Sequence, residues 1–261
     1  MELLACSGSH GFLGQALMKR LELPGREVLR LDRSGKVPKV DVVFDLAAYG
    51  NMAGHVGDPE LIYEANLQRI VRTLKEIKGR KTKLIYMSTS SVTLPKQTFY
   101  SASKKAAEEL IKLAVHEWGV RVAIARPYTV VGRGEQSAHL LPVLINSCIY
   151  GDEMPFVERP VHDYIDVEDV VDALVIISKK AKFEGEVYEI GTGKQLTNRK
   201  VKEIVEKTLK AKANVRIVKS VRKYDTTKWR ANPRKLMALG WKPKRSIQET
   251  ISSMIGDYLP M

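Results

Sequence analysis

The feature that most constrains the fold is a glycine-rich turn near the start of the chain. It is the sequence Gly8-Ser9-His10-Gly11-Phe12-Leu13-Gly14, which follows an apolar run over residues 2–7 and precedes a helical pattern over 12–21. A strand, a tight glycine turn and a helix in this order are the context that a dinucleotide-binding fingerprint requires. We therefore expect a diphosphate at the helix N-terminus, where free N–H groups and the helix dipole favour anions.

The three glycines of the turn have different expected roles. Gly8 permits the tight turn, Gly11 lets the backbone approach the diphosphate, and Gly14 allows the helix to pack closely on the sheet. The residues of the turn that we expect to bind the cofactor are Gly8, His10, Gly11, Phe12, Leu13 and Gly14.

An acidic residue closes the next predicted strand. Asp32 lies 18 residues after Gly14, where a carboxylate can accept hydrogen bonds from both ribose hydroxyls of an adenosine and repels a 2′-phosphate. The sequence therefore favours NAD over NADP, although the cations Arg33 and Lys36 lie nearby. The alternative interpretation of Asp32 is a residue that only forms a turn.

Apolar runs alternate with helical patterns as far as Pro127. Predicted strands cover residues 2–7, 27–31, 40–46, 84–87 and 120–125, and predicted helices cover 12–21, 58–78 and 100–117. This alternation predicts an α/β fold, a Rossmann-type doubly wound parallel sheet covered on both faces. Only the eight residues from Asp32 to Lys39 separate the second strand from the third, which predicts a shortened sheet.

The pattern is looser in the second half of the chain. Helices are predicted at 140–150, 167–179, 200–210 and 247–258, and short strands at 163–165 and 187–190. We expect residues 1–127 to form mainly the NAD-binding domain and residues 128–261 mainly a small substrate-binding lobe. The two are expected to interweave, with the strand near 187–190 and parts of 163–180 returning to the first sheet.

A tyrosine and a lysine open the predicted helix at residues 100–117. Tyr100 and Lys104 are four residues apart and so lie on one helix face. We expect the ammonium to favour the phenolate and thereby lower the pKa of Tyr100 towards neutrality. A phenol of this kind can exchange a proton with a substrate hydroxyl, but the same pair also occurs by chance on solvated helices.

Taken together, the glycine turn, Tyr100 and Lys104 resemble the extended branch of the short-chain dehydrogenase/reductase superfamily. This branch comprises NAD-dependent sugar-nucleotide epimerases, dehydratases and reductases. Further stretches resemble its motifs in the right order along nearly the whole chain, at residues 45–48, 66, 88–92, 126–132, 163–170, 185–191 and 239–243.

The resemblance implies roles for particular residues. Thr89 would hydrogen-bond the substrate oxygen that Tyr100 deprotonates, and Lys104 would hold the cofactor ribose. Further cofactor-binding positions would be Arg33, Leu46, Ala47, Ala48 and Pro127, and substrate-binding positions would be Thr89, Ser90, Ser91, Thr129, Arg159, His162 and Arg222.

Two departures from the family pattern narrow the expected function. The family inserts a helix and a strand where this chain has Asp32–Lys39, so we expect one strand fewer than usual. Ser90 and Ser91 stand where its 4,6-dehydratases carry an acidic pair, which disfavours dehydration. We therefore expect a 4-epimerase of a nucleoside-diphosphate sugar. The alternatives are an NAD(P)H-dependent 4-keto-sugar reductase and, in another class, a non-catalytic dinucleotide-binding sensor or interaction protein.

The net charge of +13 is concentrated in residues 199–245, which hold 17 Lys and Arg residues against three acids. This region is either an anion-binding surface or a solvated lysine-rich one. We expect no nucleic-acid partner, because Trp229 and Trp241 are better interpreted as core anchors of the small lobe than as a stacking platform.

The sequence also bears on location and assembly. No apolar run approaches the ~18–20 residues that span a bilayer, and the N-terminal stretch lacks the basic region of a signal peptide. We therefore expect a cytoplasmic protein without a membrane partner. Cys6 and Cys148 show no ligand spacing, so no metal site is predicted. The resemblance implies a homodimer.

Overall fold

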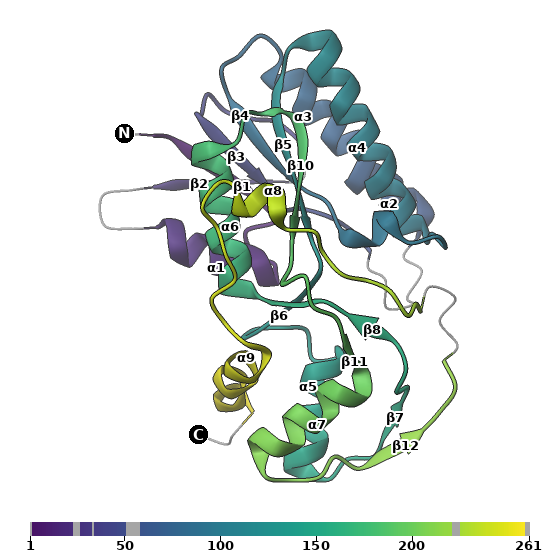
Figure 1. The fold of residues 1–261 in the computed structure, drawn as a ribbon. Helices are drawn as coiled ribbons and strands as arrows, with labels where there is room; N and C mark the ends of the chain where they lie inside the picture. The colour runs from purple at the N-terminus through teal and green to yellow at the C-terminus, as the bar shows by residue number, and fades with distance from the viewer. Residues whose placement is uncertain (1, 23–26, 33, 51–57, 221–224, 259–261) are drawn as a thin grey trace.

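The structure, a computed structural model, describes residues 2–22, 27–32, 34–50, 58–220 and 225–258. Arg33 and Arg222, both expected to bind ligands, lie outside the described residues. At the centre is a six-stranded sheet with the order β10-β5-β4-β3-β1-β2, in which every neighbouring pair is parallel (Figure 1). Its strands are β1 (Leu4–Ser7), β2 (Val28–Leu31), β3 (Val42–Asp45), β4 (Lys83–Met87), β5 (Arg121–Pro127) and β10 (Glu184–Ile190). The predicted α/β Rossmann-type sheet is confirmed.

Helices cover both faces of this sheet. On one face, α1 (Phe12–Leu21) and α6 (Val167–Lys180) pack over alternate strand residues such as Leu4 and Cys6. On the other, α3 (Arg69–Ile77) and α4 (Phe99–Trp118) pack over the intervening residues such as Ala5. The alternation arises because successive strand side chains point to opposite faces.

The predicted helix at 58–78 is formed in three segments. Asp58 accepts a hydrogen bond from the Glu60 amide and so caps α2 (Pro59–Tyr63), with Pro59 at its first turn. A π-helical turn, η1 (Glu64–Gln68), joins α2 to α3. Between β2 and β3, the described residues 32 and 34–41 form neither helix nor strand.

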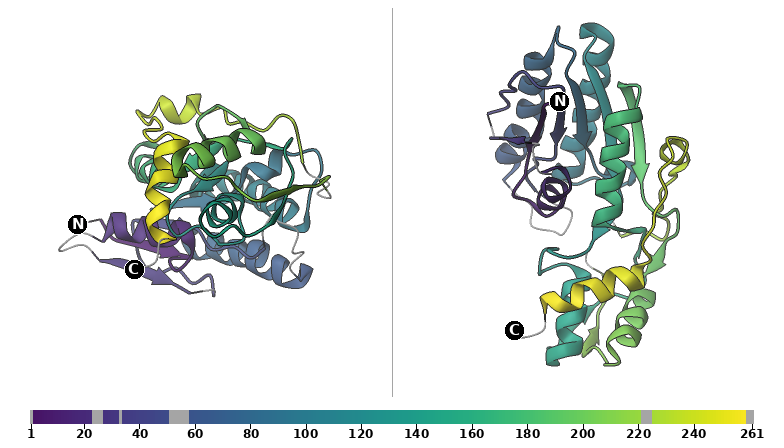
Figure 2. Two further views of the ribbon diagram at one scale, coloured as in Figure 1. Left: turned by 90° about the horizontal axis from the view of Figure 1, so that it is seen from below. Right: turned by 90° about the vertical axis from the view of Figure 1, so that its left-hand side faces the viewer.

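A smaller group of elements lies below the carboxyl edge of the sheet in Figure 1. The helices α5 (Leu140–Tyr150), α7 (Asn198–Leu209) and α9 (Ile247–Met254) share a separate apolar core. Three short strand pairs accompany them: β6 (Thr129–Val131) with β9 (Tyr164–Asp166), β7 (Met154–Phe156) with β12 (Val215–Ile217), and β8 (Val161–His162) with β11 (Leu196–Thr197). Figure 2 shows α9 lying across this group.

The chain returns to the main sheet before it reaches α9. The short helix α8 (Arg234–Met237) contacts β10, and Trp241 is buried in the core that α1 and α6 share with the sheet. The indole N–H of Trp241 donates to the Asp169 carbonyl oxygen of α6. The prediction that Trp241 anchors the small lobe is therefore wrong, because the 231–245 segment crosses back over α6.

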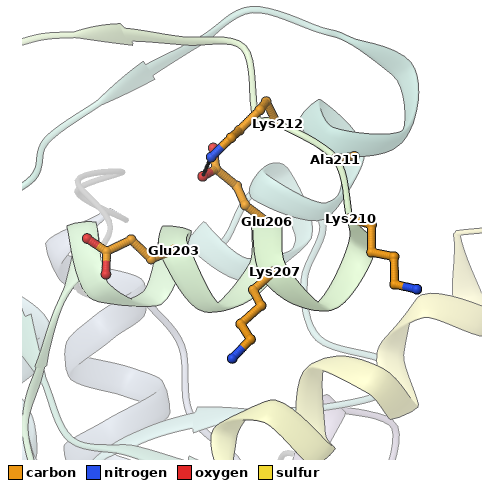
Figure 3. Close-up of a pocket in the computed structure, with 6 residues that line it drawn as sticks. All are labelled: Glu203, Glu206, Lys207, Lys210, Ala211 and Lys212. Carbon is orange, nitrogen blue, oxygen red and sulfur yellow. Dashed lines mark hydrogen bonds and ion pairs between the residues drawn. The ribbon is translucent and has the colours of Figure 1, made fainter.

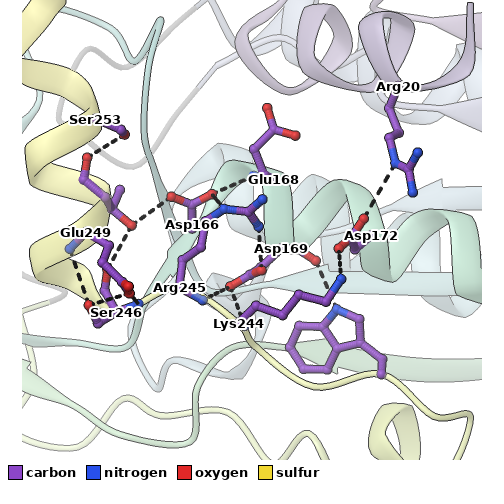
Figure 4. A network of polar contacts seen from close by, with 12 residues as sticks. Arg20, Asp166, Glu168, Asp169, Asp172, Lys244, Arg245, Ser246, Glu249 and Ser253 are labelled. Carbon is purple, nitrogen blue, oxygen red and sulfur yellow. Dashed lines mark hydrogen bonds and ion pairs between the residues drawn. The ribbon is translucent and has the colours of Figure 1, made fainter.

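Several basic residues of the 199–245 region are neutralised within the fold. Lys244 and Arg245 pair with acidic residues at the start of α6, at 2.6 Å from Asp172 and 2.8 Å from Asp169 (Figure 4). In the hollow beside the end of α7, Lys212 pairs with the buried Glu206 (Figure 3). These contacts indicate that part of the positive charge stabilises the structure. None of the described helices is both long and apolar enough to span a bilayer.

Candidate functional site

The strand order reverses between β1 and β3, and sheets of this kind bind ligands outside the carboxyl ends of their strands at such a point. The glycine turn follows β1 at this edge, Asp32 follows β2, residues 46–48 follow β3, and Thr89 follows β4. The structure thus brings together four predicted groups that lie up to 81 residues apart between Gly8 and Thr89.

The glycine turn is shaped for close backbone approach. Gly8 has φ +69°, and a Cβ there would lie 2.7 Å from the Ala47 amide nitrogen, so the turn packs against the loop after β3. A Cβ at Gly14 would lie 2.0 Å from the Gly8 carbonyl oxygen. Gly14 therefore permits packing of α1 against the turn itself, whereas the sequence predicted packing against the sheet.

The N-terminus of α1 fits an anion. Its N-cap, Gly11, offers no side-chain hydrogen bond to the first N–H groups of the helix. A phosphate can satisfy these groups, and the helix dipole favours its charge. His10 and Gly11 are exposed beside them, and Phe12 and Leu13 begin the helix. These residues fit the diphosphate of a dinucleotide.

Asp32 is exposed at the end of β2, and its carboxylate accepts hydrogen bonds from Ser34, at 2.6 Å from the hydroxyl and 2.8 Å from the amide. The Ser34 hydroxyl and then its amide lower the pKa of Asp32, which is therefore ionised at neutral pH. Asp32 therefore forms a turn, and its charged carboxylate can also accept hydrogen bonds from the free hydroxyls of a ribose.

A buried ion pair that sequence reasoning missed supports the loop after β3. Arg69 of α3 contacts the Asp45 carboxylate at 2.5 and 3.2 Å and the Ala47 carbonyl oxygen at 2.7 Å. The Ser7 hydroxyl also donates to Asp45 and accepts from the Ala47 amide, so β1, β3 and α3 are joined beneath the glycine turn. Leu46 and Ala48 lie on the loop that this network holds. The only sequence feature that pointed to this ion pair was the acidic residue at the end of a predicted strand, Asp45.

A second support reaches the start of α4. Asn66, in the π-helical turn, pairs with both backbone groups of Tyr49 at 2.9 Å and donates to the Ser103 hydroxyl at 3.0 Å. It is 1% exposed. Asn66 therefore fixes the loop after β3 against the helix that carries Tyr100 and Lys104.

Tyr100 and Lys104 lie in the first turns of α4, as predicted. Thr98 caps this helix in a reciprocal capping box with Ser101, which sets where the helix begins. Tyr100 is partly buried and hydrogen-bonds the Thr89 side chain. Lys104 is 1% exposed and donates from Nζ to the Met87 carbonyl oxygen at 2.6 Å. Thr89, Tyr100 and Lys104 therefore converge beyond the end of β4.

The predicted lowering of the Tyr100 pKa is wrong for this structure. Burial raises the pKa of Tyr100 to about 12, and the hydrogen bond with Thr89 opposes the rise only in part. Lys104 is not among the groups that lower the Tyr100 pKa, and its ammonium contacts the Met87 carbonyl oxygen and the Tyr86 ring. Burial also lowers the pKa of Lys104 to about 7, so its positive charge is itself weakened at neutral pH.

The residues after Thr89 form a short 3₁₀ helix, η2 (Ser90–Thr93). Ser90 and Ser91 are buried at 2% and 0% exposure, and the Ser91 hydroxyl lies 3.0 Å from the Thr89 hydroxyl. Sequence reasoning missed Glu108, a buried carboxylate on α4 that accepts hydrogen bonds from Ser88 and Arg126. Glu108 lies four residues after Lys104, and this spacing could have predicted that the two side chains share one face of the helix.

The predicted substrate residues are only partly brought together. The Thr129 hydroxyl lies 3.0 Å from the His162 Nδ1, and the His162 ring lies 5.1 Å from the Trp229 ring, centroid to centroid. The indole nitrogen of Trp229 is buried and has no hydrogen-bond partner among the described residues. Pro127 ends β5 two residues before Thr129, whereas Arg159 is exposed in the loop before β8.

Known proteins share both the sequence pattern and the fold. Residues 6–191 match the sequence profile of the NAD dependent epimerase/dehydratase family. A UDP-glucose 4-epimerase of Lactobacillus helveticus is 24% identical over 94% of this chain and 92% of its own length. A GDP-6-deoxy-D-mannose reductase of Pseudomonas aeruginosa is 24% identical over 98% of this chain and 96% of its own.

Among solved structures, a UDP-glucuronic acid 4-epimerase from Bacillus cereus, in complex with UDP-glucuronic acid and NAD, superposes with a TM-score of 0.87. It is 20% identical and covers 97% of this chain and 98% of its own, which shows a shared fold. The glycine turn, Asp32 and the Tyr100–Lys104 pair agree with the match to the family profile. The chain therefore belongs to the NAD-dependent epimerase/dehydratase family, in the extended branch of the short-chain dehydrogenases/reductases, and its cofactor is NAD.

Proposed function

We propose that this protein is a 4-epimerase of a nucleoside-diphosphate sugar. The observation that carries the proposal is the convergence of Thr89, Tyr100 and Lys104 at the carboxyl end of β4, with hydroxyls in place of carboxylates at Ser90 and Ser91. Two of the relatives described above act as 4-epimerases of UDP-sugars, which supports the same substrate class here.

In the proposed reaction Tyr100 accepts the proton of a sugar hydroxyl, and the Thr89 hydroxyl holds the same oxygen in place. When bound, NAD would supply the hydride acceptor and donor that epimerisation requires. Lys104 would hold the cofactor ribose. Because burial keeps the Tyr100 phenol protonated at neutral pH, we expect its pKa to fall only when further positive charge enters the site.

The second candidate is a nucleotide 4-keto-sugar reductase, which the similarity to a sugar-nucleotide reductase favours. The two differ in redox balance. An epimerase leaves the amount of NADH unchanged over many turnovers, whereas a reductase oxidises one NADH per product. Absorbance of NADH, followed together with chromatography of the sugar products, distinguishes the two.

The test uses the wild-type protein, NAD and a panel of UDP-, GDP-, CDP- and dTDP-sugars. Tyr100→Phe should reduce turnover about 10²–10⁴-fold, as expected when a general acid–base is lost. Tyr150→Phe is the matched control, because Tyr150 is exposed on α5 and its hydroxyl donates to the Tyr258 carbonyl oxygen. Full activity of Tyr100→Phe would rule out the proposed role of Tyr100 as the acid–base. No epimerised product from any sugar of the panel would rule out the 4-epimerase and leave the reductase or a sensor or interaction protein.

We also propose a homodimer in which α2 and α4 of two copies pack together. Large apolar side chains on these helices are 37–59% exposed: Leu61, Tyr63, Phe99, Leu110 and Leu113. Helices α2 and α4 contact each other, and exposed apolar side chains on adjacent helices are typical of an interface. The division into residues 1–127 and 128–261, the roles assigned to individual residues and the cytoplasmic location remain predictions.

A further inference from the structure

Tyr86 lies directly beneath the proposed catalytic lysine. It is the residue before Met87 on β4 and is 0% exposed. The Lys104 Nζ lies 4.5 Å from the centroid of its ring and 2.6 Å from the Met87 carbonyl oxygen. Two successive residues of one strand thus contact the same ammonium, one through an aromatic face and one through a backbone acceptor.

The hydroxyl of Tyr86 takes no part in this arrangement. It is buried and has no hydrogen-bond partner among the residues that the structure describes. An unpartnered buried hydroxyl is unfavourable, since it loses its bonds to water without replacement. The ring, rather than the hydroxyl, is therefore the part of Tyr86 that has a favourable polar contact.

We propose that Tyr86 is a positioning residue, whose aromatic face holds the Lys104 ammonium against β4 at the cofactor site. The inference rests on the proposed function, in which Lys104 holds the cofactor ribose. An aromatic face attracts a cation through its quadrupole, most strongly where water is excluded. At this site the ring replaces part of the solvation that Lys104 loses on burial.

Charged groups on β3, α3 and α4 act on Lys104 as well. Burial is the main cause that lowers its pKa, and Arg69 of α3 lowers it further, whereas Asp45 of β3 and Glu108 of α4 raise it. Asp45 pairs in register with Tyr86 on the adjacent strand. The pKa of Lys104 is thus set by opposing effects. We expect loss of the ring's attraction for the ammonium to lower that pKa by an amount that titration can detect.

The test replaces Tyr86 in the full-length protein by phenylalanine, by leucine, and by mono- and trifluorinated phenylalanine. Fluorination weakens the attraction of the ring face for a cation while nearly keeping its shape, so these variants report on Lys104 even where Tyr86→Leu does not fold. Titration of Lys104 is followed by NMR of ¹³C-labelled lysine without NAD, with Lys104→Met to assign the signal. Affinity for NAD is measured by equilibrium titration.

Tyr86→Phe should keep the Lys104 midpoint and the NAD affinity, because the ring remains. Stepwise fluorination should lower the midpoint progressively, by about half a unit to one unit in total, and weaken NAD binding roughly 2–5-fold near neutral pH. Equal midpoints in all ring variants would overturn the proposal, as would a change in Tyr86→Phe as large as that in Tyr86→Leu. The NMR readout needs no substrate, so it succeeds or fails independently of the proposed epimerase activity.

Discussion

Replacement of Gly14 by alanine tests whether the glycine turn works through close backbone packing. A Cβ at this position would lie 2.0 Å from the Gly8 carbonyl oxygen, 2.8 Å from the Ser9 Cα and 2.9 Å from the Gly8 carbonyl carbon. All three are backbone atoms, so no side-chain rotation relieves the clash. The 2.0 Å approach must open to at least 3.0 Å, the shortest that real Cβ atoms show, so α1 and the turn must separate by roughly 1 Å.

The expected losses in stability and in NAD affinity follow from that separation. Overpacking of this kind costs about 1–3 kcal/mol in free energy of unfolding, which lowers Tm by roughly 2–12 °C in a chain of this size. We expect the displaced turn to lose about two backbone hydrogen bonds to the charged phosphate, which would cost about 3–6 kcal/mol of binding free energy. NAD affinity should therefore fall by about 10²–10⁴-fold.

The assay is NAD binding by calorimetry or fluorescence, together with thermal unfolding. Gly256→Ala is the matched control, because a Cβ there has nothing within 4 Å and should change neither quantity. If Gly14→Ala binds NAD within threefold of the wild-type Kd, the turn does not hold the diphosphate through close backbone approach.

Three further perturbations probe the buried charges and the exposed face. Arg69→Met leaves Asp45 buried without its partner and should lower the free energy of unfolding, measured in urea, by about 3–5 kcal/mol. Adding Asp45→Asn should make this loss smaller. A loss below about 1 kcal/mol in Arg69→Met would contradict the role of this pair. Lys104 has a native pKa of about 7 against an ordinary 10.5, so between these pH values the unfolded chain binds one proton more and the free energy of unfolding rises with pH. Urea titrations of the NAD-free protein at pH 7 and 9 should show that rise, and Lys104→Met should reduce it; an equal rise in both proteins would refute the assignment. Leu113→Glu places a charge on the exposed face of α4 and should give monomers in sedimentation velocity, whereas an intact dimer would place the interface elsewhere.

Much of the fold was predictable because local signals decide it. The helix predicted at 140–150 is found as Leu140–Tyr150, and Asp58 with Pro59 marks the start of α2 as expected. Apolar periodicity, capping residues and glycine turns each depend on residues that are close together in the sequence, so the sequence alone predicts them. The same holds for the Tyr100–Lys104 pair, whose spacing alone places both residues on one face of α4.

Only the tertiary structure decided which groups from distant parts of the chain contact a given residue. Spacing placed Lys104 beside Tyr100, but packing set its ammonium over the Tyr86 ring and against a strand carbonyl. Asp163 similarly accepts hydrogen bonds from Thr192, Gly193 and Ala231, up to 68 residues away. A pKa depends on burial and on such partners, which no local pattern contains. The sequence by itself therefore predicted Tyr100 and Lys104 as the proton-transfer pair and the glycine turn as the cofactor site, whereas burial by the folded chain decided that Tyr100 holds its proton at neutral pH.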